Sequence, residues 1–239
     1  MHKGIYKTLC YFVYGLIALN SLVKLPKHSQ DCIFVLIYII MSEHIDKKLL
    51  DDDIIYRFEY LSKFLNFTEN DIATLNAFEK IIQPVIPSAV DGIYQKLLNN
   101  DVTKQYFLKQ NYGFEGIMTT EATQVTVKSD QMIFRINSMR KYLLRVLRQR
   151  IWNDAFLNYL SNVGKMHTNM TGASSINVDY VHINALFGHL EHILIDAVLS
   201  SDELDGEAKK ATILALNKLF WIQNDFFAMH YIIASKNGN

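Results

Sequence analysis

Histidine and tyrosine side chains are the residues of this chain whose positions indicate chemistry. His167 follows a segment in which apolar residues recur at helical spacing, and Tyr94 lies on another apolar stripe. A neutral imidazole is a common metal ligand, although a lone histidine on an apolar helix is more often a hydrogen-bonded structural residue. A buried tyrosine hydroxyl could donate into a site or bond to a backbone carbonyl. Both residues are therefore candidates for a site, with core packing as the alternative.

Three further histidines lie close together in the sequence, but their spacing does not predict a zinc site. His182, His189 and His192 flank Glu191 within a predicted helix. A catalytic zinc site usually needs three converging protein ligands and an open position, and the sequence contains no HExxH motif. We therefore expect these histidines to be exposed.

Helices must position these side chains, because apolar residues recur at intervals of three and four over most of the chain. The stripes predict helices over residues 53–67, 68–82, 88–98, 133–150, 152–167, 178–199 and 205–233. Pro84 and Pro87 predict a corner after the second of these helices. Residues 110–130 lack a lasting period and predict a loop beside a site.

The composition favours an all-α domain and disfavours a nucleic-acid partner. Half of the 239 residues are apolar, and only three prolines and ten glycines interrupt the chain. The 24 basic side chains balance the 24 acidic ones, so no net charge would attract nucleic acid. The two cysteines, Cys10 and Cys32, leave the rest of the chain without a thiol. We therefore expect a reducing, cytoplasmic location.

Residues 1–41 form an apolar extension that differs from the rest of the chain. The stretch from Thr8 to Val23 carries no charge, and a second apolar run spans Cys32 to Met41. A membrane-spanning helix needs about 20 apolar residues, whereas a signal-peptide core has about 7–15. Three interpretations stay open: a signal-like segment, membrane association through residues 8–41, or a gene-model artefact upstream of a true start at Met41. The predicted domain occupies residues 50–233.

The segment NYLSNVGKMHTN, Asn158 to Asn169, resembles the proximal segment of protoglobins and globin-coupled sensors. The shared features are an aromatic-rich helix, a glycine three residues before a histidine, and then a loop, matched here by Gly164 and His167. The segment AVDGIYQKLLNNDVTKQYF is similar to the family's distal region, with Tyr94 in the place of the distal tyrosine. The resemblance implies a globin-like helical sandwich with an additional N-terminal helix.

This resemblance also implies a haem b cofactor with His167 as the axial ligand of the iron. Tyr94 would donate a hydrogen bond to the bound gas, and Ile93 replaces a bulky aromatic residue of the archaeal proteins, which implies a differently shaped distal pocket. The other expected haem contacts are Met139, Tyr142, Leu143, Val163 and Phe187. Candidates for pairing with the haem propionates are Arg140, Lys141 and Arg145. A basic run of this kind is otherwise a solvated face.

The function expected from this resemblance is reversible binding of O2, CO or NO by a gas sensor, store or scavenger without an attached output domain. We also expect a homodimer through the last two helices. The apolar residues assigned to that interface are Leu186, Phe187, Leu190, Leu194, Leu219, Phe220, Phe226 and Phe227. An enzymatic role such as NO dioxygenation would need a separate reductase, because no flavin or nicotinamide motif is visible. The alternative is a haem-free helical interaction module, tethered to a membrane by its N-terminus.

Overall fold

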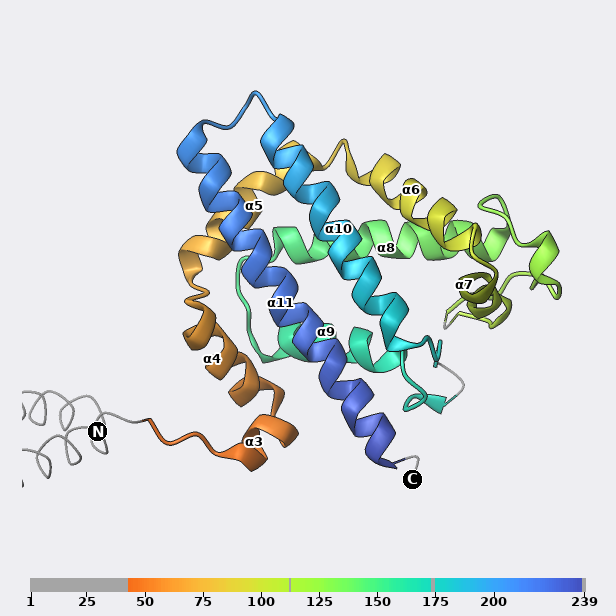
Figure 1. Ribbon diagram of the computed structural model, residues 1–239, viewed down its shortest axis with the longest axis horizontal. Helices are drawn as coiled ribbons and strands as arrows, with labels where there is room; N and C mark the ends of the chain where they lie inside the picture. Colours follow the sequence, from red (N-terminus) through yellow and green to blue (C-terminus); the bar gives the residue numbers. More distant parts are fainter. Residues whose placement is uncertain (1–42, 112, 173–174, 238–239) are drawn as a thin grey trace, which may run out of the picture. The chain divides into compact units, whose positions relative to one another are not determined.

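The computed structural model describes residues 43–111, 113–172 and 175–237 (Figure 1). Residues Lys48–Asn239 form one compact unit, which contains the candidate site. The apolar runs between Thr8 and Met41, with their three interpretations, lie outside the described residues. Within the described ranges, no helix combines the length and apolarity that crossing a membrane requires.

The described chain is all α-helical, as the sequence predicted. The α-helices are α3 (Lys47–Asp52), α4 (Ile54–Leu65), α5 (Glu69–Ile82), α6 (Ile86–Leu98), α7 (Asp101–Gln105), α8 (Asp130–Arg148), α9 (Asp154–Met166), α10 (Tyr180–Ser200) and α11 (Gly206–Asn237). Two short 3-10 turns, η1 (Tyr106–Leu108) and η2 (Ala122–Gln124), flank the loop before α8. Each helix that the apolar spacing predicted is present, with its ends displaced by a few residues.

Polar side chains next to the apolar stripes determine where several helices begin. The Asp53 carboxylate accepts hydrogen bonds from Ile55 N and Tyr56 N at the start of α4. The backbone N–H of Thr68 donates to Asp71 Oδ2 at 2.8 Å, as part of a capping box whose Thr and Asp stand three residues apart in the sequence. These bonds satisfy backbone groups that the first helical turn leaves without partners.

Helix α11 is the central element of the fold, since it packs against α10, α9, α5 and α4. Figure 1 shows α10 and α11 side by side, crossing over α8 and α9. The core between these layers is apolar and includes fully buried Phe78, Leu157 and Phe226. A bidentate ion pair between Arg57 and Asp225 connects α4 to α11. The arrangement leaves α6, α8, α9 and α10 around one interior space.

Helices α9 and α11 approach closely at Gly164. A Cβ atom added at this glycine would lie 3.2 Å from both Cα and Cδ2 of Phe227, and 3.4 Å from Cδ2 of His230. A side chain at position 164 would therefore push against the backbone of α11. The glycine three residues before His167 thus sets how near α11 lies to the end of α9.

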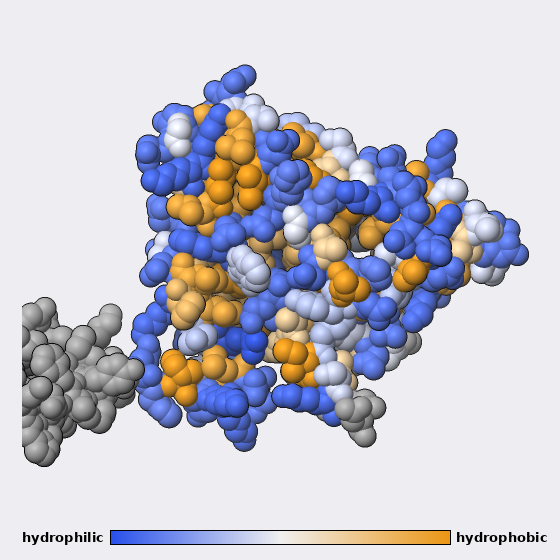
Figure 2. All heavy atoms as spheres, viewed as in Figure 1, coloured by the Kyte–Doolittle hydropathy of each residue, from blue (hydrophilic) through white to orange (hydrophobic). Residues whose placement is uncertain are grey.

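Two expectations about apolar residues were wrong in detail. Phe64 lies on the apolar stripe that predicts the helix over residues 53–67, a stripe expected to be buried, but it is 73% exposed and its ring lies beside that of Tyr60. Six of the residues assigned to a dimer interface are buried in the core of their own chain: Leu190, Leu194, Leu219, Phe220, Phe226 and Phe227. The exposed apolar residues of α11 are Leu214, Trp221 and Ile232, and Figure 2 shows hydrophobic groups on the face that α10 and α11 present.

Candidate functional site

The candidate site is an apolar cavity of about 380 Å³ inside the helical unit. Its walls come from α6 to α11 and from η1, the residues after it and the stretch that leads into α10. The volume falls in the range of small-molecule sites, about 300–1,000 Å³. Most of the lining is apolar, so the few polar side chains that line the cavity determine what chemistry it can support.

His167 lies on one wall of the cavity, directly after the end of α9. Its Nδ1 lies 2.8 Å from the carbonyl oxygen of Val163. A carbonyl oxygen can only accept, so Nδ1 carries the proton and Nε2 carries the lone pair. Burial lowers the pKa of His167, and the charge of Arg135 lowers it further, while the hydrogen bond to Val163 opposes both effects. The ring is therefore a neutral imidazole with one nitrogen available as a ligand.

Tyr94 enters the same cavity from α6. Its side chain is 8% exposed, and its ring packs against Phe107 with the centroids 5.9 Å apart. Burial raises the pKa of its phenol to about 12, although the positive charge of Arg135 opposes this shift. No described residue forms a hydrogen bond with the hydroxyl. Tyr94 therefore brings a protonated donor without a protein partner into an apolar space.

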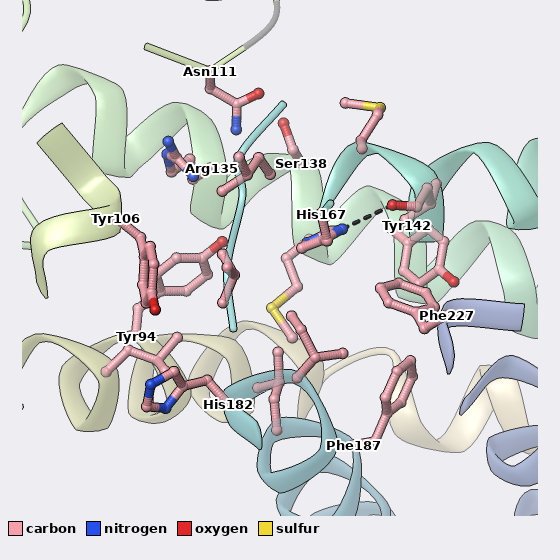
Figure 3. Close-up of a pocket in the computed structure, with 18 of the residues that line it drawn as sticks. Tyr94, Tyr106, Asn111, Arg135, Ser138, Tyr142, His167, His182, Phe187 and Phe227 are labelled. Carbon is pink, nitrogen blue, oxygen red and sulfur yellow. Dashed lines mark hydrogen bonds between the residues drawn. The ribbon is translucent and has the colours of Figure 1, made fainter. Parts of the chain in front are cut away.

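Figure 3 places the polar groups at two ends of the cavity. Tyr94, Tyr106 and Arg135 gather toward one end, whereas His167 lies toward the end formed by Tyr142 and Phe227. The His167 ring packs against Phe227, with the centroids 5.2 Å apart. The α11 helix thus supports the imidazole on the side away from Tyr94.

All seven residues expected to contact a haem line this one cavity: His167, Tyr94, Met139, Tyr142, Leu143, Val163 and Phe187. Their roles as haem contacts stay predictions. The hydroxyl of Tyr142 donates a hydrogen bond to the side chain of Gln223. Tyr142 therefore contributes its aromatic ring, and no free hydroxyl, to the cavity wall. Phe187 and Leu186, which were also assigned to a dimer interface, both line the cavity and are partly buried.

Comparison with known proteins identifies the family to which this helical arrangement belongs. The protoglobin family model matches residues 55–237, which is most of the chain. The chain belongs to the protoglobin family. The match begins within α4 and ends within α11, so it contains the whole cavity and both segments whose resemblance was noted in the sequence.

A solved structure supports the same fold for this protoglobin. The globin domain of the Geobacter sulfurreducens globin-coupled sensor superposes with a TM-score of 0.56 and 13% identical residues. The match covers 72% of this chain and 96% of that domain. No curated protein sequence matches the chain. The structural likeness, at this level of identity, establishes a globin fold.

Two cavity residues of this protoglobin escaped the sequence analysis. Arg135 belongs to the same basic run of α8 as Arg140, a run that would otherwise be a solvated face, but it is 4% exposed and lines the cavity. Helical spacing could have shown this, since Arg135 stands four residues before Met139 and seven before Tyr142. His182 was expected to be exposed, yet it also lines the cavity and packs against the ring of Tyr106.

The three basic residues proposed for the haem propionates lie outside the cavity lining. Arg140 pairs with Asp91 at 2.6 Å, and Cζ of Arg145 lies over the Tyr159 ring, 3.7 Å from its centroid. Lys141 is exposed. Glu191, between the histidines of α10, accepts a hydrogen bond from Asn217. In the part of the chain that the structure describes, no three acidic, histidine or cysteine side chains form a metal-binding group.

Proposed function

We propose that this protoglobin binds haem b in its cavity through His167 and reversibly binds O2, CO or NO there. The observation that carries the proposal is the juxtaposition of a neutral imidazole and an unpartnered tyrosine hydroxyl in one apolar cavity. Bound iron protoporphyrin would supply the metal centre to which a diatomic gas attaches. The apolar walls and the free Nε2 of His167 fit such a group.

The protein's own contribution on the proximal side is to hold the imidazole. The carbonyl oxygen of Val163 accepts a hydrogen bond from Nδ1–H of His167 and so fixes the tautomer and the orientation of the ring. The low pKa of His167 keeps Nε2 unprotonated and available at neutral pH. Helix α9 and the packed ring of Phe227 limit the movement of the histidine.

On the distal side, Tyr94 would donate a hydrogen bond to the gas. Its raised pKa keeps the phenol protonated at every physiological pH. Met139, Leu143, Val163 and Phe187 would form the apolar walls, with the ring of Tyr142 beside them. A gas with a partly negative outer atom gains most from this hydroxyl, so Tyr94 would slow the escape of O2.

The role that fits these properties is a gas sensor, store or scavenger in the cytoplasm, working as a homodimer through α10 and α11. The solved relative is by its title the globin domain of a globin-coupled sensor. The segment at residues 50–233 would act as one haem domain, and NO dioxygenation would require an external reductant.

The proposal is tested by absorption spectra of the purified full-length chain in the ferric, ferrous and CO-bound states. Haem uptake should give a Soret band that shifts on reduction and on addition of CO. A preparation that takes up no haem when the cofactor is supplied would instead support the haem-free interaction module.

A further inference from the structure

A second, smaller cavity lies between α8, α10 and α11, within the part of the core that the structure describes. Its volume is about 30 Å³. Val146 and Leu147 line it from α8, Leu194 from α10 and Leu219 from α11, and each of these side chains is 4% exposed or less. Close-packed protein interiors contain few voids larger than a water molecule. A space of this size beside a ligand cavity is therefore a candidate site of its own.

The small cavity has room for one small molecule. A cavity can hold a water molecule once its volume reaches roughly 10–15 Å³. The small cavity offers about twice this volume, which suits a diatomic gas or a xenon atom. Organic ligands are excluded, because their pockets have volumes of about 300 Å³ or more.

The walls of the small cavity favour an apolar guest over water. Only two of its lining side chains carry polar groups, and these two are bonded to each other, since the Tyr142 hydroxyl donates to the side chain of Gln223. A buried water usually makes about three hydrogen bonds, whereas an apolar cavity stays dry and can bind xenon. The ligand class that fits the small cavity is therefore an uncharged, apolar gas.

The small cavity adjoins the main cavity, which is the candidate haem site. Four side chains line both cavities: Tyr142, Leu143, Phe187 and Leu190. One layer of side chains therefore separates the two spaces. Figure 3 shows Tyr142 and Phe187 toward the end of the main cavity at which His167 lies.

The ring of Phe187 stands between the two spaces. It packs edge-on against Phe227, which lines the main cavity, with the centroids 4.9 Å apart. It also packs edge-on against Phe220, which lines the small cavity, with the centroids 6.1 Å apart. Rotation of this one ring would open a path through the shared wall while the helices stay in place.

We propose that the small cavity is a docking site for one molecule of apolar gas, which retains O2, CO or NO that has left the haem before the gas rebinds or escapes. The role in rebinding rests on the proposed function. The affinity for an apolar gas depends only on the cavity, so the two parts can be tested separately.

Xenon is the probe for the site, because it is uncharged, apolar and small. The full-length protein, supplied with haem and CO, is labelled with carbon-13 in its Ile, Leu and Val methyl groups and titrated with xenon. Methyl shifts at Val146, Leu194 and Leu219 would report occupation of the small cavity. Shifts at Val163 and Ile183 would report the main cavity, since these two residues line only that one.

Two substitutions of the same kind separate a real cavity from an ordinary packed core. Val146→Ile adds one carbon atom to the wall of the small cavity, and Val198→Ile is the matched control, because Val198 is 0% exposed and lines neither cavity. Val146→Ile should weaken xenon binding roughly tenfold or more and leave the urea midpoint close to that of wild type. Val198→Ile should leave xenon binding unchanged and lower the midpoint, since it overpacks a filled position.

A second variant, Leu194→Phe, fills the same space from α10. It should likewise weaken xenon binding at the small cavity. Loss of the fold in both filled variants would show that the space is not there and would overturn the site.

Flash photolysis of the CO complex tests the role of the site in rebinding. Wild type should show a slower phase of rebinding from within the protein that xenon suppresses, and Val146→Ile should lack this phase without xenon. The same phase in both proteins would overturn the role in rebinding.

The failure of this inference can be told apart from the failure of the proposed function. A haem-loaded protein without xenon-dependent shifts at Val146, Leu194 and Leu219 would overturn the docking site and leave haem binding intact. A protein that shows these shifts but takes up no haem would keep the site and overturn both its role in rebinding and the proposed function.

Discussion

The carbonyl oxygen of Val163 lies 2.8 Å from Nδ1 of His167, one helical turn further along the chain. The bond crosses the end of α9, where a carbonyl would otherwise lack a partner. It therefore satisfies the helix terminus and selects the tautomer that leaves Nε2 free. The same bond explains how a histidine can be both part of the fold and available as a ligand.

The hydroxyl of Tyr94 should affect gas binding without contributing to the stability of the fold. Tyr94→Phe keeps the ring contact with Phe107 and removes a group that no described residue bonds. We expect O2 to dissociate roughly 3- to 10-fold faster, as expected for the loss of one hydrogen bond of about 0.5–1.5 kcal/mol. Stopped-flow kinetics measures this rate.

Tyr106→Phe is the matched control for Tyr94. The Tyr106 ring lines the same cavity, but its hydroxyl donates to Asp179 at 2.8 Å. This variant should leave the O2 dissociation rate close to that of wild type. Equal rates for Tyr94→Phe and wild type would exclude Tyr94 as a donor to the gas.

The close approach of α9 and α11 predicts a marked cost for a methyl group at Gly164. Gly164→Ala would place Cβ 3.2 Å from the backbone of Phe227. We expect a loss of about 1–3 kcal/mol in the free energy of unfolding, since the helices must separate. Gly188→Ala in α10, where nothing lies within 4 Å, should be neutral or raise stability by up to about 1 kcal/mol. Urea denaturation compares the two, and equal effects would contradict this packing.

His230 should make the fold sensitive to acid. Burial, followed by the charges of Lys165 and Arg57, lowers its pKa to about 4, although a hydrogen bond with the backbone of Ser161 opposes the shift. The unfolded chain binds this proton near pH 6.5, so protonation favours unfolding. The stabilising contribution is complete above about pH 6.5 and is lost as the pH falls toward 4.

The pH dependence of the unfolding free energy can be compared with that of a variant that has no titratable side chain at position 230. The unfolding free energy of wild type should fall by about 1.4 kcal/mol per pH unit more than that of His230→Gln between pH 6.5 and 4. Parallel stability curves for the two proteins would show that His230 titrates normally in the folded state.

The exposed apolar residues of α11 locate the expected dimer interface. Leu214, Trp221 and Ile232 are each more than half exposed, and their spacing of 7 and 11 residues places them on one stripe. Trp221→Glu should weaken dimerisation by roughly tenfold or more. Ile117→Glu, at an exposed loop residue, is the control. Sedimentation velocity that gives a monomer for wild type would contradict the predicted dimer.

The helices could be predicted from the sequence because each has a regular apolar stripe and several have a recognisable cap. The Thr68 and Asp71 signal before α5 is an example. Position relative to other helices was harder to predict. Phe64 in α4 and Leu219 in α11 both lie on apolar stripes, but the first is exposed and the second is buried, a difference that depends on which helices pack against each stripe.

Cavity residues that match a family motif could be named from the sequence, whereas those placed only by tertiary packing could not. Gly164 and His167 share a motif, and both have a clear structural role at the end of α9. Arg135 carries no motif and lies in a run of basic residues, so its charge suggested solvent. Helical spacing from Met139 indicates that it faces the cavity, but the carbonyl oxygen of Lys109, which accepts its hydrogen bond, is brought there by tertiary packing.

His167 is the residue proposed to hold iron protoporphyrin in this cavity, and spectra of the His167→Ala variant test that role. The full-length protein would be compared with His167→Ala and with His182→Ala, the other histidine that lines the cavity. We predict a Soret band and a ferrous CO complex for wild type and His182→Ala, with His167→Ala losing the axial-ligand spectrum and most of its bound haem. Identical spectra for wild type and His167→Ala would contradict the account.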